Sequence, residues 1–228
     1  LHVTHAYNGI QWIAILVHVI VLFFAIIFHE IAHGYVAYLC GDPTAKNAGR
    51  LTLNPLAHID PFGSVILPAI CAILGWPGFG YAKPVPYNPN NLRRRRIDEV
   101  LVALAGPLSN LLQAALSAGI YRILIGFVRN NPAWAMAHID LLAVWIIPIL
   151  STIIISNIVL AVFNLIPLPP LDGSKLLLLI LPEDARQKFY RIEPYCMIAL
   201  MALLWFAPEK INAIIDTGVS FFMKLMVG

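Results

Sequence analysis

The chain has 228 residues, of which 60% are hydrophobic and only 12% are charged, and its mean hydropathy is +0.79. This composition excludes an ordinary soluble globular protein and predicts an all-α polytopic protein of the lipid bilayer, with four to six transmembrane helices. The formal net charge is +3, and much of the excess lies in the block Arg93–Arg96, which is typical of the cytoplasmic side of a membrane. No basic face extends beyond this block, so we expect no nucleic-acid partner.

Four stretches are long and apolar enough to span a bilayer, and each lacks charge through its middle. They cover residues 11–39, 97–127, 139–168 and 189–207. The first is too long for the apolar core of a signal peptide, so we expect it to remain in the mature protein. A fifth stretch, 209–227, carries scattered charges, which leaves open whether it lies at the membrane interface or closes the bundle as a short helix.

A segment rich in Pro, Gly and Asn, residues 51–92, separates the first two spanning stretches. Its apolar run 62–74 would rise only about 20 Å as a helix, short of a hydrocarbon core roughly 30 Å thick, so we predict that it is re-entrant. Residues 50–53 and 81–86 alternate like short edge strands, which predicts a small β-hairpin or sheet. At membrane depth such backbone needs protein or a watery cavity around it, as a substrate groove would provide.

The first spanning stretch contains the sequence HEIAHG at 29–34, in which Glu30 is the only formally charged side chain between residues 11 and 39. His29 and His33 lie one turn apart on the same face of a helix, so both imidazoles can hold one metal ion. Glu30 can then act on the water bound to that ion. This arrangement is typical of zinc hydrolases, here inside a membrane-spanning helix.

A third metal ligand must come from elsewhere, because a catalytic zinc commonly has three protein ligands and one water. The candidate is Asp172, which follows the uncharged run 141–171 and lies in NLIPLPPLDG. The three prolines of that motif end the helix and remove backbone hydrogen bonds, which allows a carboxylate to turn toward a neighbouring helix. We therefore expect Zn2+, one ion per chain, bound by His29, His33 and Asp172.

The expected topology agrees with this ligand set. If 62–74 is re-entrant, the arginine block lies inside, the second span leads out, and the third brings Asp172 back to the inner side. His33 lies about 9 Å before the inner end of the first span, so the ligands meet at a similar depth, nearer the cytoplasmic side. If 62–74 crossed the membrane, Asp172 would end on the opposite side and could not reach the same ion.

Three motifs resemble those of a known family, the site-2 proteases, which are zinc metalloproteases that cut within the membrane-spanning helices of other proteins. HEIAHG at 29–34 and NLIPLPPLDG at 164–173 resemble its two metal-binding motifs, and ALAGPLSN at 103–110 resembles its Gly-Pro-x-x-Asn helix. The similarity covers most of the chain and is to the compact members, in which the HExxH helix comes first and no PDZ or CBS domain is present.

The resemblance implies a single membrane-embedded metalloprotease domain over residues 1–228, in a multi-pass protein of the cell membrane. Zinc-activated water would cleave transmembrane segments of membrane-anchored proteins, as in regulated intramembrane proteolysis. Glu30 would be the catalytic base, which takes the proton of that water and passes it to the leaving amine. The sequence predicts no particular oligomeric state.

Several further polar residues are candidates for substrate binding. Asn164 matches the family's asparagine that binds substrate or the oxyanion. Asn110 could support the site or bond to a neighbouring helix, and for Asn157 the interhelical contact is favoured. His58 could face the cavity near the metal, although a loop histidine satisfied by backbone groups is favoured. Close helix packing, rather than chemistry, is expected of the small residues Ala103, Ala105, Gly106, Ser109 and Ala114.

Two other functional classes could use the same residues. A metal-ion transporter or channel could use His29, His33 and Asp172 as a transit site. Such a site gains nothing specific from a base beside the first histidine, so Glu30 favours the hydrolase. An inactive relative that binds membrane helices as a chaperone would have no need of every ligand and the base together.

Overall fold

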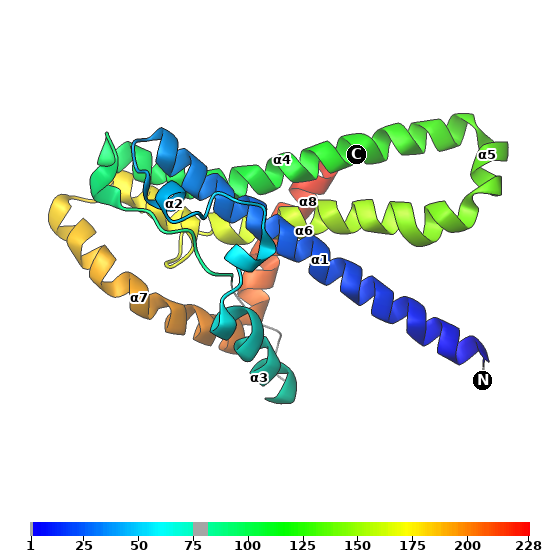
Figure 1. Cartoon of the computed structure of the whole chain (residues 1–228), viewed down its shortest axis with the longest axis horizontal. Coiled ribbons are helices and arrows are strands. Elements are labelled where there is room, and N and C mark those ends of the chain that lie inside the picture. Colours follow the sequence, from blue (N-terminus) through cyan, green and yellow to red (C-terminus); the bar gives the residue numbers. More distant parts are fainter. Residues whose placement is uncertain (1, 75–81) are drawn as a thin grey trace. The chain divides into compact units, whose positions relative to one another are not determined.

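The structure, a computed structural model, describes residues 2–74 and 82–228, and the backbone alone for residues 2–11, 65, 68, 72 and 74 (Figure 1). Helices account for most of these residues. In chain order the helical elements are α1 (His2–Leu39), α2 (Thr44–Asn47), η1 (Pro55–Ala57), η2 (Pro61–Ile66), α3 (Leu67–Leu74), η3 (Pro89–Asn91), α4 (Arg95–Asn130), α5 (Pro132–Ala137), η4 (Leu141–Ile146), α6 (Ile147–Leu165), η5 (Asp172–Leu179), α7 (Glu183–Phe206) and α8 (Pro208–Met226).

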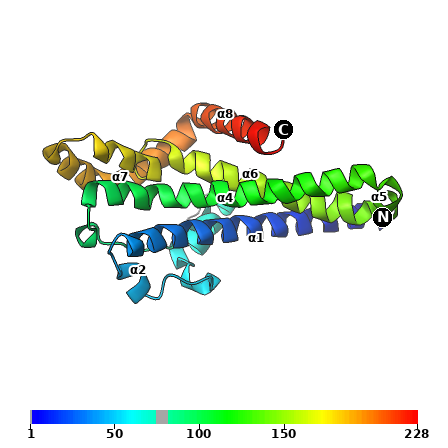
Figure 2. The ribbon, with the colours of Figure 1, turned by 90° about the horizontal axis from the view of Figure 1, so that it is seen from above.

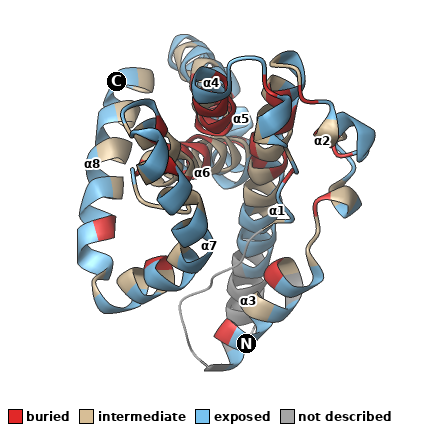
Figure 3. Ribbon diagram, turned by 90° about the vertical axis from the view of Figure 1, so that its left-hand side faces the viewer, coloured by how far each residue is buried: buried red, intermediate tan, exposed pale blue. Residues whose placement is uncertain are grey.

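Four segments are long and apolar enough to cross a membrane, namely Trp12–Leu39, Arg95–Asn130, Leu141–Leu165 and Glu183–Phe206. They confirm the four spanning stretches that the sequence predicts. Large apolar side chains cover their outer surfaces: Ile123 is 75% and Phe206 is 82% exposed, and Figure 3 shows most of α7 in the pale blue of exposed residues. Lipid tails are as apolar as these side chains, so the surface suits a bilayer and not water.

The chain divides into two compact units. The first unit contains Leu1–Ala25, Asn110–Phe163 and Ala207–Gly228, and the second contains Ile26–Ser109 and Asn164–Phe206. The N-terminal half of α1, most of α4 and α6, and all of α8 therefore belong to the first unit. The HEIAHG helix segment, the whole irregular segment after it, η5 and α7 belong to the second.

The core of the first unit lies where α4, α6 and α8 pack together. Figure 1 shows α4 and α6 joined through α5. Alanines on α4 allow the approach of the branched side chains of α6, and α8 adds larger side chains. The buried residues are Ala114, Ala118, Ile154, Ile158 and Val162, with Val219, Phe222 and Met223 of α8 against them. Residues 209–227 thus belong to a helix that packs against α4 and α6, and whether this helix also lies at the membrane interface stays a prediction.

Two asparagines tie the helices of the first unit together. Asn110 Nδ2 donates to Asn157 Oδ1 at 2.8 Å and to the carbonyl of Ala25 at 3.1 Å. Asn157 Nδ2 donates to the carbonyl of Ile153 at 2.9 Å. Both side chains are at most 1% exposed, so in a bilayer these bonds satisfy polar groups that have no access to water. The interhelical role expected for Asn157 is confirmed, and Asn110 shares it.

In the second unit, the chain after α2 runs back along α1 (Figures 1 and 2). The extended residues that follow position 81 also lie against this part of α1, and their N–H groups bond to side chains and to one carbonyl. The bonds are Lys83 N to His58 O (2.9 Å), Val85 N to Glu30 Oε2 (2.8 Å) and Asn88 N to Asp42 Oδ2 (2.6 Å).

This bonding explains why the predicted hairpin is not confirmed. No strand occurs in residues 2–74 and 82–228, because donors that a β-ladder would use are taken by two carboxylates and a carbonyl. Residues 50–53 meet residues 82–86 through a side chain instead: Arg50 Nη2 donates to the carbonyl of Lys83 at 2.6 Å. Residues 75–81, with Tyr81 of the expected second strand, lie outside the described residues.

The predicted re-entrant run begins as η2 and continues as α3, ending at Leu74. Asp60 caps it, since its Oδ1 accepts the N–H of Gly63 at 2.7 Å, and Pro61 occupies the first helical position, where a missing N–H costs nothing. The run is a short apolar helical segment and not one of the four spanning helices. The structure describes no residue from 75 to 81, so re-entry stays a prediction.

Asp42 holds the end of α1 to the segment before α4. It is fully buried, and its carboxylate accepts bonds from Thr44 N (3.1 Å), Thr44 Oγ1 (2.5 Å), Asn88 N (2.6 Å) and Asn91 Nδ2 (2.7 Å). Burial alone would raise the pKa of the Asp42 carboxyl, but these hydrogen bonds outweigh it and hold the pKa below its ordinary value. The carboxylate is therefore a fixed negative charge that orders the loop.

Candidate metal centre

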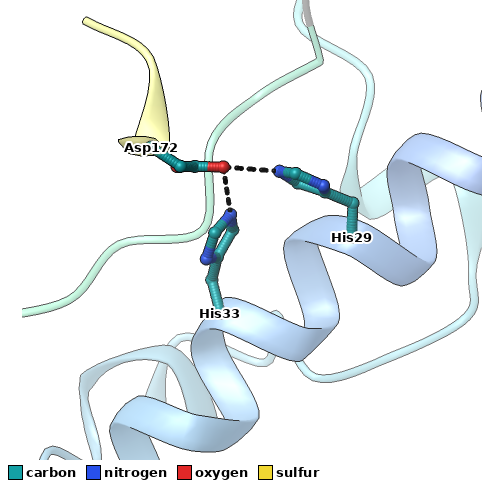
Figure 4. A group of neighbouring side chains, drawn as sticks. All are labelled: His29, His33 and Asp172. Carbon is teal, nitrogen blue, oxygen red and sulfur yellow. Dashed lines mark ion pairs between the residues drawn. The ribbon is translucent and has the colours of Figure 1, made fainter. Parts of the chain in front are cut away.

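Three side chains meet at one point of the second unit. His29 and His33 lie one turn apart on α1, and Asp172 reaches them from the first residue of η5 (Figure 4). Asp172 Oδ2 lies 3.0 Å from His29 Nε2 and 3.3 Å from His33 Nε2. The exposed fractions of these side chains are 8%, 13% and 22% for His29, His33 and Asp172, so the cluster is largely shielded.

The three ligand atoms fit a single divalent ion. All lie within 4.8 Å of one another, and two ligands of a tetrahedral zinc, each about 2.1 Å from the ion, are separated by about 3.4 Å. Asp172 Oδ2 is also a buried oxygen that makes no hydrogen bond within the described residues, although both imidazole nitrogens face it. Two imidazoles and one carboxylate are a donor set that zinc takes in catalytic sites.

The orientation of His33 is fixed from behind by α4. Its Nδ1 lies 2.7 Å from the carbonyl oxygen of Val102. A carbonyl can only accept, so Nδ1 carries the hydrogen and Nε2 presents a lone pair to the point where Asp172 and His29 meet. This contact selects the tautomer in which His33 Nε2 is able to bind a metal ion.

Gly106 brings α4 close to both imidazoles. A Cβ added there would lie 2.5 Å from His29 Nε2, and it would also collide with His33 Nε2. Any other residue would occupy the space in which the ligand nitrogens converge. Gly106 is therefore part of the site, beyond the close packing that the sequence predicts for it.

Asp172 is positioned by the glycine after it and by an ion pair further along η5. A Cβ at Gly173 would collide with the carbonyl group of Leu165, at the end of α6, so the turn can approach α6 only without a side chain. Lys175 Nζ donates to both carboxylate oxygens of Glu193 on α7, at 2.6 and 2.7 Å. The element that carries Asp172 is thus held on two sides.

The histidines also affect the ionisation of Asp172. Burial would raise the pKa of its carboxyl, but the interactions with His29 and His33 outweigh burial and hold this pKa below its ordinary value. This effect requires hydrogens on the imidazole nitrogens that face Asp172, and a bound cation would take the place of those hydrogens.

Glu30 lies next to His29 on α1 and is held by a backbone group. Its Oε2 accepts the N–H of Val85 at 2.8 Å. The side chain of Val85 packs at Gly34, where an added Cβ would lie 2.6 Å from Val85 Cγ1. The extended segment around Val85 therefore contacts α1 at Glu30 and again one turn later, at Gly34.

The other predicted candidates take different places. His58 is fully buried in a loop, and its Nε2 lies 2.8 Å from the carbonyl of Thr52. This is the backbone contact that the sequence favours for it. His58 is not one of the three converging side chains. Asn164 lies in the last turn of α6, half-buried, in the second unit. Asn110 belongs to the asparagine pair of the first unit.

Three contributors to the site escape sequence reasoning. Val102 acts through its carbonyl, which every residue has, and Val85 through its N–H, so no side-chain pattern marks either. Gly106 stands directly before Pro107 in the Gly-Pro motif, and that motif is the one signal that could have assigned it to the site.

Comparisons with known proteins agree with this geometry. The model of Peptidase family M50 matches residues 17–207. The chain is 38% identical over 185 residues to "Putative zinc metalloprotease YwhC" of Bacillus subtilis, across 81% of this chain and 78% of that protein. It is also 34% identical over 146 residues to "Putative zinc metalloprotease Rip2" of Mycolicibacterium smegmatis, across 64% of this chain and 49% of that protein.

A third relative, "Putative zinc metalloprotease Rip2" of Mycobacterium tuberculosis strain H37Rv, is 28% identical over 179 residues, across 77% of this chain and 61% of that protein. The chain thus spans between about half and three fifths of the length of these two Rip2 proteins. No solved structure matches the chain.

Proposed function

Since this chain belongs to peptidase family M50, we propose that it cleaves other proteins within their membrane-spanning segments. Membership of the family makes the chain a zinc metalloendopeptidase. Its four apolar helices make it an integral, multi-pass membrane protein. A protease whose two histidine ligands lie on such a helix has membrane-embedded peptide bonds within reach, and this is the reason for proposing substrates of that kind.

The proposal assigns the zinc to His29, His33 and Asp172. The single observation that carries it is the convergence of their three ligand atoms within 4.8 Å, beside a carboxylate on the same helix. When bound, zinc polarises a peptide carbonyl and lowers the pKa of its water to about 7. The chain's own contribution is to fix the ligand orientations through Val102 and to keep the space open at Gly106.

Glu30 is assigned the proton transfers. It accepts the proton of the attacking water through one carboxylate oxygen and passes it to the nitrogen of the leaving amine. Asn164, in the last turn before the proline-rich motif, is assigned to hold the substrate carbonyl by hydrogen bonding. The arginine block, exposed at Arg93–Arg96, supports a plasma-membrane protein whose catalytic end faces the cytoplasm.

The first experiment uses the purified full chain in liposomes with a single-span membrane protein as substrate, and mass spectrometry sizes the products. Wild-type protein should cut within the span. Glu30→Gln should retain one zinc per chain and produce no cut. Cuts confined to residues outside the span, or equal cleavage by Glu30→Gln, would contradict the proposal.

A second experiment measures metal content. Asp172→Ala should hold well below one zinc per chain, because a ligand is lost, whereas Asp140→Ala, which removes an exposed carboxylate at the start of η4, should keep the full amount. Full occupancy in Asp172→Ala would remove the third ligand from the assignment. Zinc flux into the same liposomes without cleavage would favour a metal transporter, the alternative that the ligand set leaves open.

A further inference from the structure

The segment Pro84-Val85-Pro86 contacts one face of α1 at two successive turns. Val85 N–H donates to Glu30 Oε2 at 2.8 Å. The side chain of Val85 is 7% exposed. It fills the space left by the missing side chain of Gly34, where Leu51 and Ala45 also pack. Residues 30 and 34 lie on the same face of a helix, so the side-chain contact fixes where the N–H points.

The two prolines limit which backbone N–H groups this segment can offer to Glu30. Proline has no N–H and a fixed φ, and it also restricts the residue before it. Val85 therefore carries the only backbone N–H between residues 84 and 86, in a conformation that both neighbours limit. Lys83 is held as well, because its N–H bonds to the carbonyl of His58 and its own carbonyl accepts from Arg50. The donor is in place before any substrate arrives.

We propose that Val85 is the positioning residue for the catalytic carboxylate. Its N–H holds Oε2 of Glu30 and thereby directs Oε1, which makes no hydrogen bond within the described residues, toward the water and the leaving amine. Without this bond, the three torsions of a glutamate side chain would let the carboxylate leave the productive orientation. Pre-organisation of a reacting group in this way raises the rate of the chemical step. The inference rests on the proposed function of Glu30.

Hydrogen exchange tests the contact without any cleavage assay. The flanking prolines isolate the Val85 amide, so overlapping peptides can report its exchange alone. In Glu30→Gln, the side chain keeps an acceptor oxygen and the amide should stay protected. In Glu30→Ala the acceptor is gone, and exchange at Val85 should be roughly ten- to a hundredfold faster, as expected for loss of a charge-assisted bond. Equal exchange in the two variants would overturn the contact.

Kinetics of the zinc-loaded full chain test its consequence. Val85→Pro removes the N–H, whereas Val85→Ala keeps the N–H and loses the side chain. Relative to Val85→Ala, Val85→Pro should lower kcat by about tenfold to a hundredfold, since misplacement of a reacting group by about 1 Å costs that much. The KM should change by less than about twofold, and zinc content should remain one per chain. Equal kcat values for the two variants would overturn the positioning role.

These outcomes are separable from failure of the proposed function. A wild-type chain that cleaves no membrane-spanning substrate would refute the proposed function, while protection of the Val85 amide by Glu30 would still be measured. If Val85→Pro does not fold, the exchange comparison between Glu30→Ala and Glu30→Gln, in which residue 85 is unaltered, decides the question alone.

Discussion

At the scale of single residues, the metal centre depends as much on a missing side chain as on the ligands. Gly106 leaves the space in which the two imidazole nitrogens and the Asp172 oxygen converge. The atoms that an alanine would meet belong to rings held on both sides, by Val102 behind His33 and by the helix itself. Such atoms cannot give way as the end of a flexible chain can.

We therefore expect Gly106→Ala to lose zinc. Its methyl group would overlap His29 Nε2 and His33 Nε2, so metal content should fall several-fold, although alanine favours a helix over glycine by about 1 kcal/mol. Elemental analysis of the purified variant checks this. Gly126→Ala on the same helix is the matched control, because a Cβ there meets nothing within 4 Å, and it should keep one zinc per chain.

At this scale, the sequence predicts the contributions that side chains make and misses those that main-chain atoms make. His29 and His33 have distinctive side chains at helical spacing, and Asp172 follows a proline-rich motif, so the sequence predicts the cluster of three side chains that the structure brings together. Val102 and Val85 act through main-chain groups, and Gly106 acts through the space it leaves. Those contributions depend on how closely segments approach one another, and the residue type at a position does not predict them.

At the scale of elements, α4 and α7 are joined by a buried ion network. Glu99 is fully buried and accepts from Arg95 Nε (3.2 Å), Arg186 Nη2 (3.3 Å) and Tyr190 Oη (2.5 Å). A second pair, Arg96–Glu183 at 3.4 Å, joins the same helices, but both of its side chains are more than half exposed. The two contacts allow the effect of burial to be separated from the effect of charge pairing.

Arg186→Ala should lower the free energy of unfolding by about 3 kcal/mol, because it leaves a buried carboxylate with too few partners. Arg96→Ala should cost less than about 1 kcal/mol, as exposed pairs do. Unfolding in detergent micelles, followed by circular dichroism, measures both. Similar losses in the two variants would show that burial of Glu99 contributes nothing.

The loop before α4 should show a pH dependence that comes from Asp42. Its folded pKa lies below the ordinary value of 3.8, so its contribution to stability is fully present above that pH and is lost as the pH falls through the folded pKa. Asp42→Asn removes this contribution. Thermal unfolding should therefore separate the wild type from Asp42→Asn widely at pH 7, and the gap should narrow below about pH 4. A gap that is constant with pH would contradict this role.

The sequence predicts the four spanning helices, but the hairpin that it also predicts is not confirmed. The four spanning helices follow from long apolar runs with few charges, and in a membrane a run of this length is most simply a helix. The hairpin of residues 50–53 and 81–86 was predicted from alternation, but alternation says only which side chains share a face. Where the backbone donors go was decided by Glu30, Asp42 and the carbonyl of His58, all distant in sequence.

At the scale of the whole molecule, the chemistry and the bundle packing occupy different units. The first unit consists of helices packed through alanines and the Asn110–Asn157 pair, and the second contains every proposed catalytic group. Stability changes in the first unit should therefore be measurable without a change in the metal site.

Asn157→Ala tests this separation. It leaves Asn110 with one partner fewer in an apolar surrounding, and the unfolding free energy should fall by about 1 kcal/mol, the scale of interhelical hydrogen bonds in membranes. Zinc content should remain one per chain. The exposed Asn131, replaced by alanine, should change neither quantity. Loss of zinc from Asn157→Ala would contradict the division of roles.

The contact between His33 and Val102 also fixes the register of α4. A slide of this helix by a single residue, about 1.5 Å along its axis, would move the Val102 carbonyl away from the imidazole and bring Ala105 or Pro107 to the position that only Gly106 fits. A captured ion would hold the imidazole of His33 from the other side, so metal loading should reinforce a register that the Val102 contact and Gly106 already set.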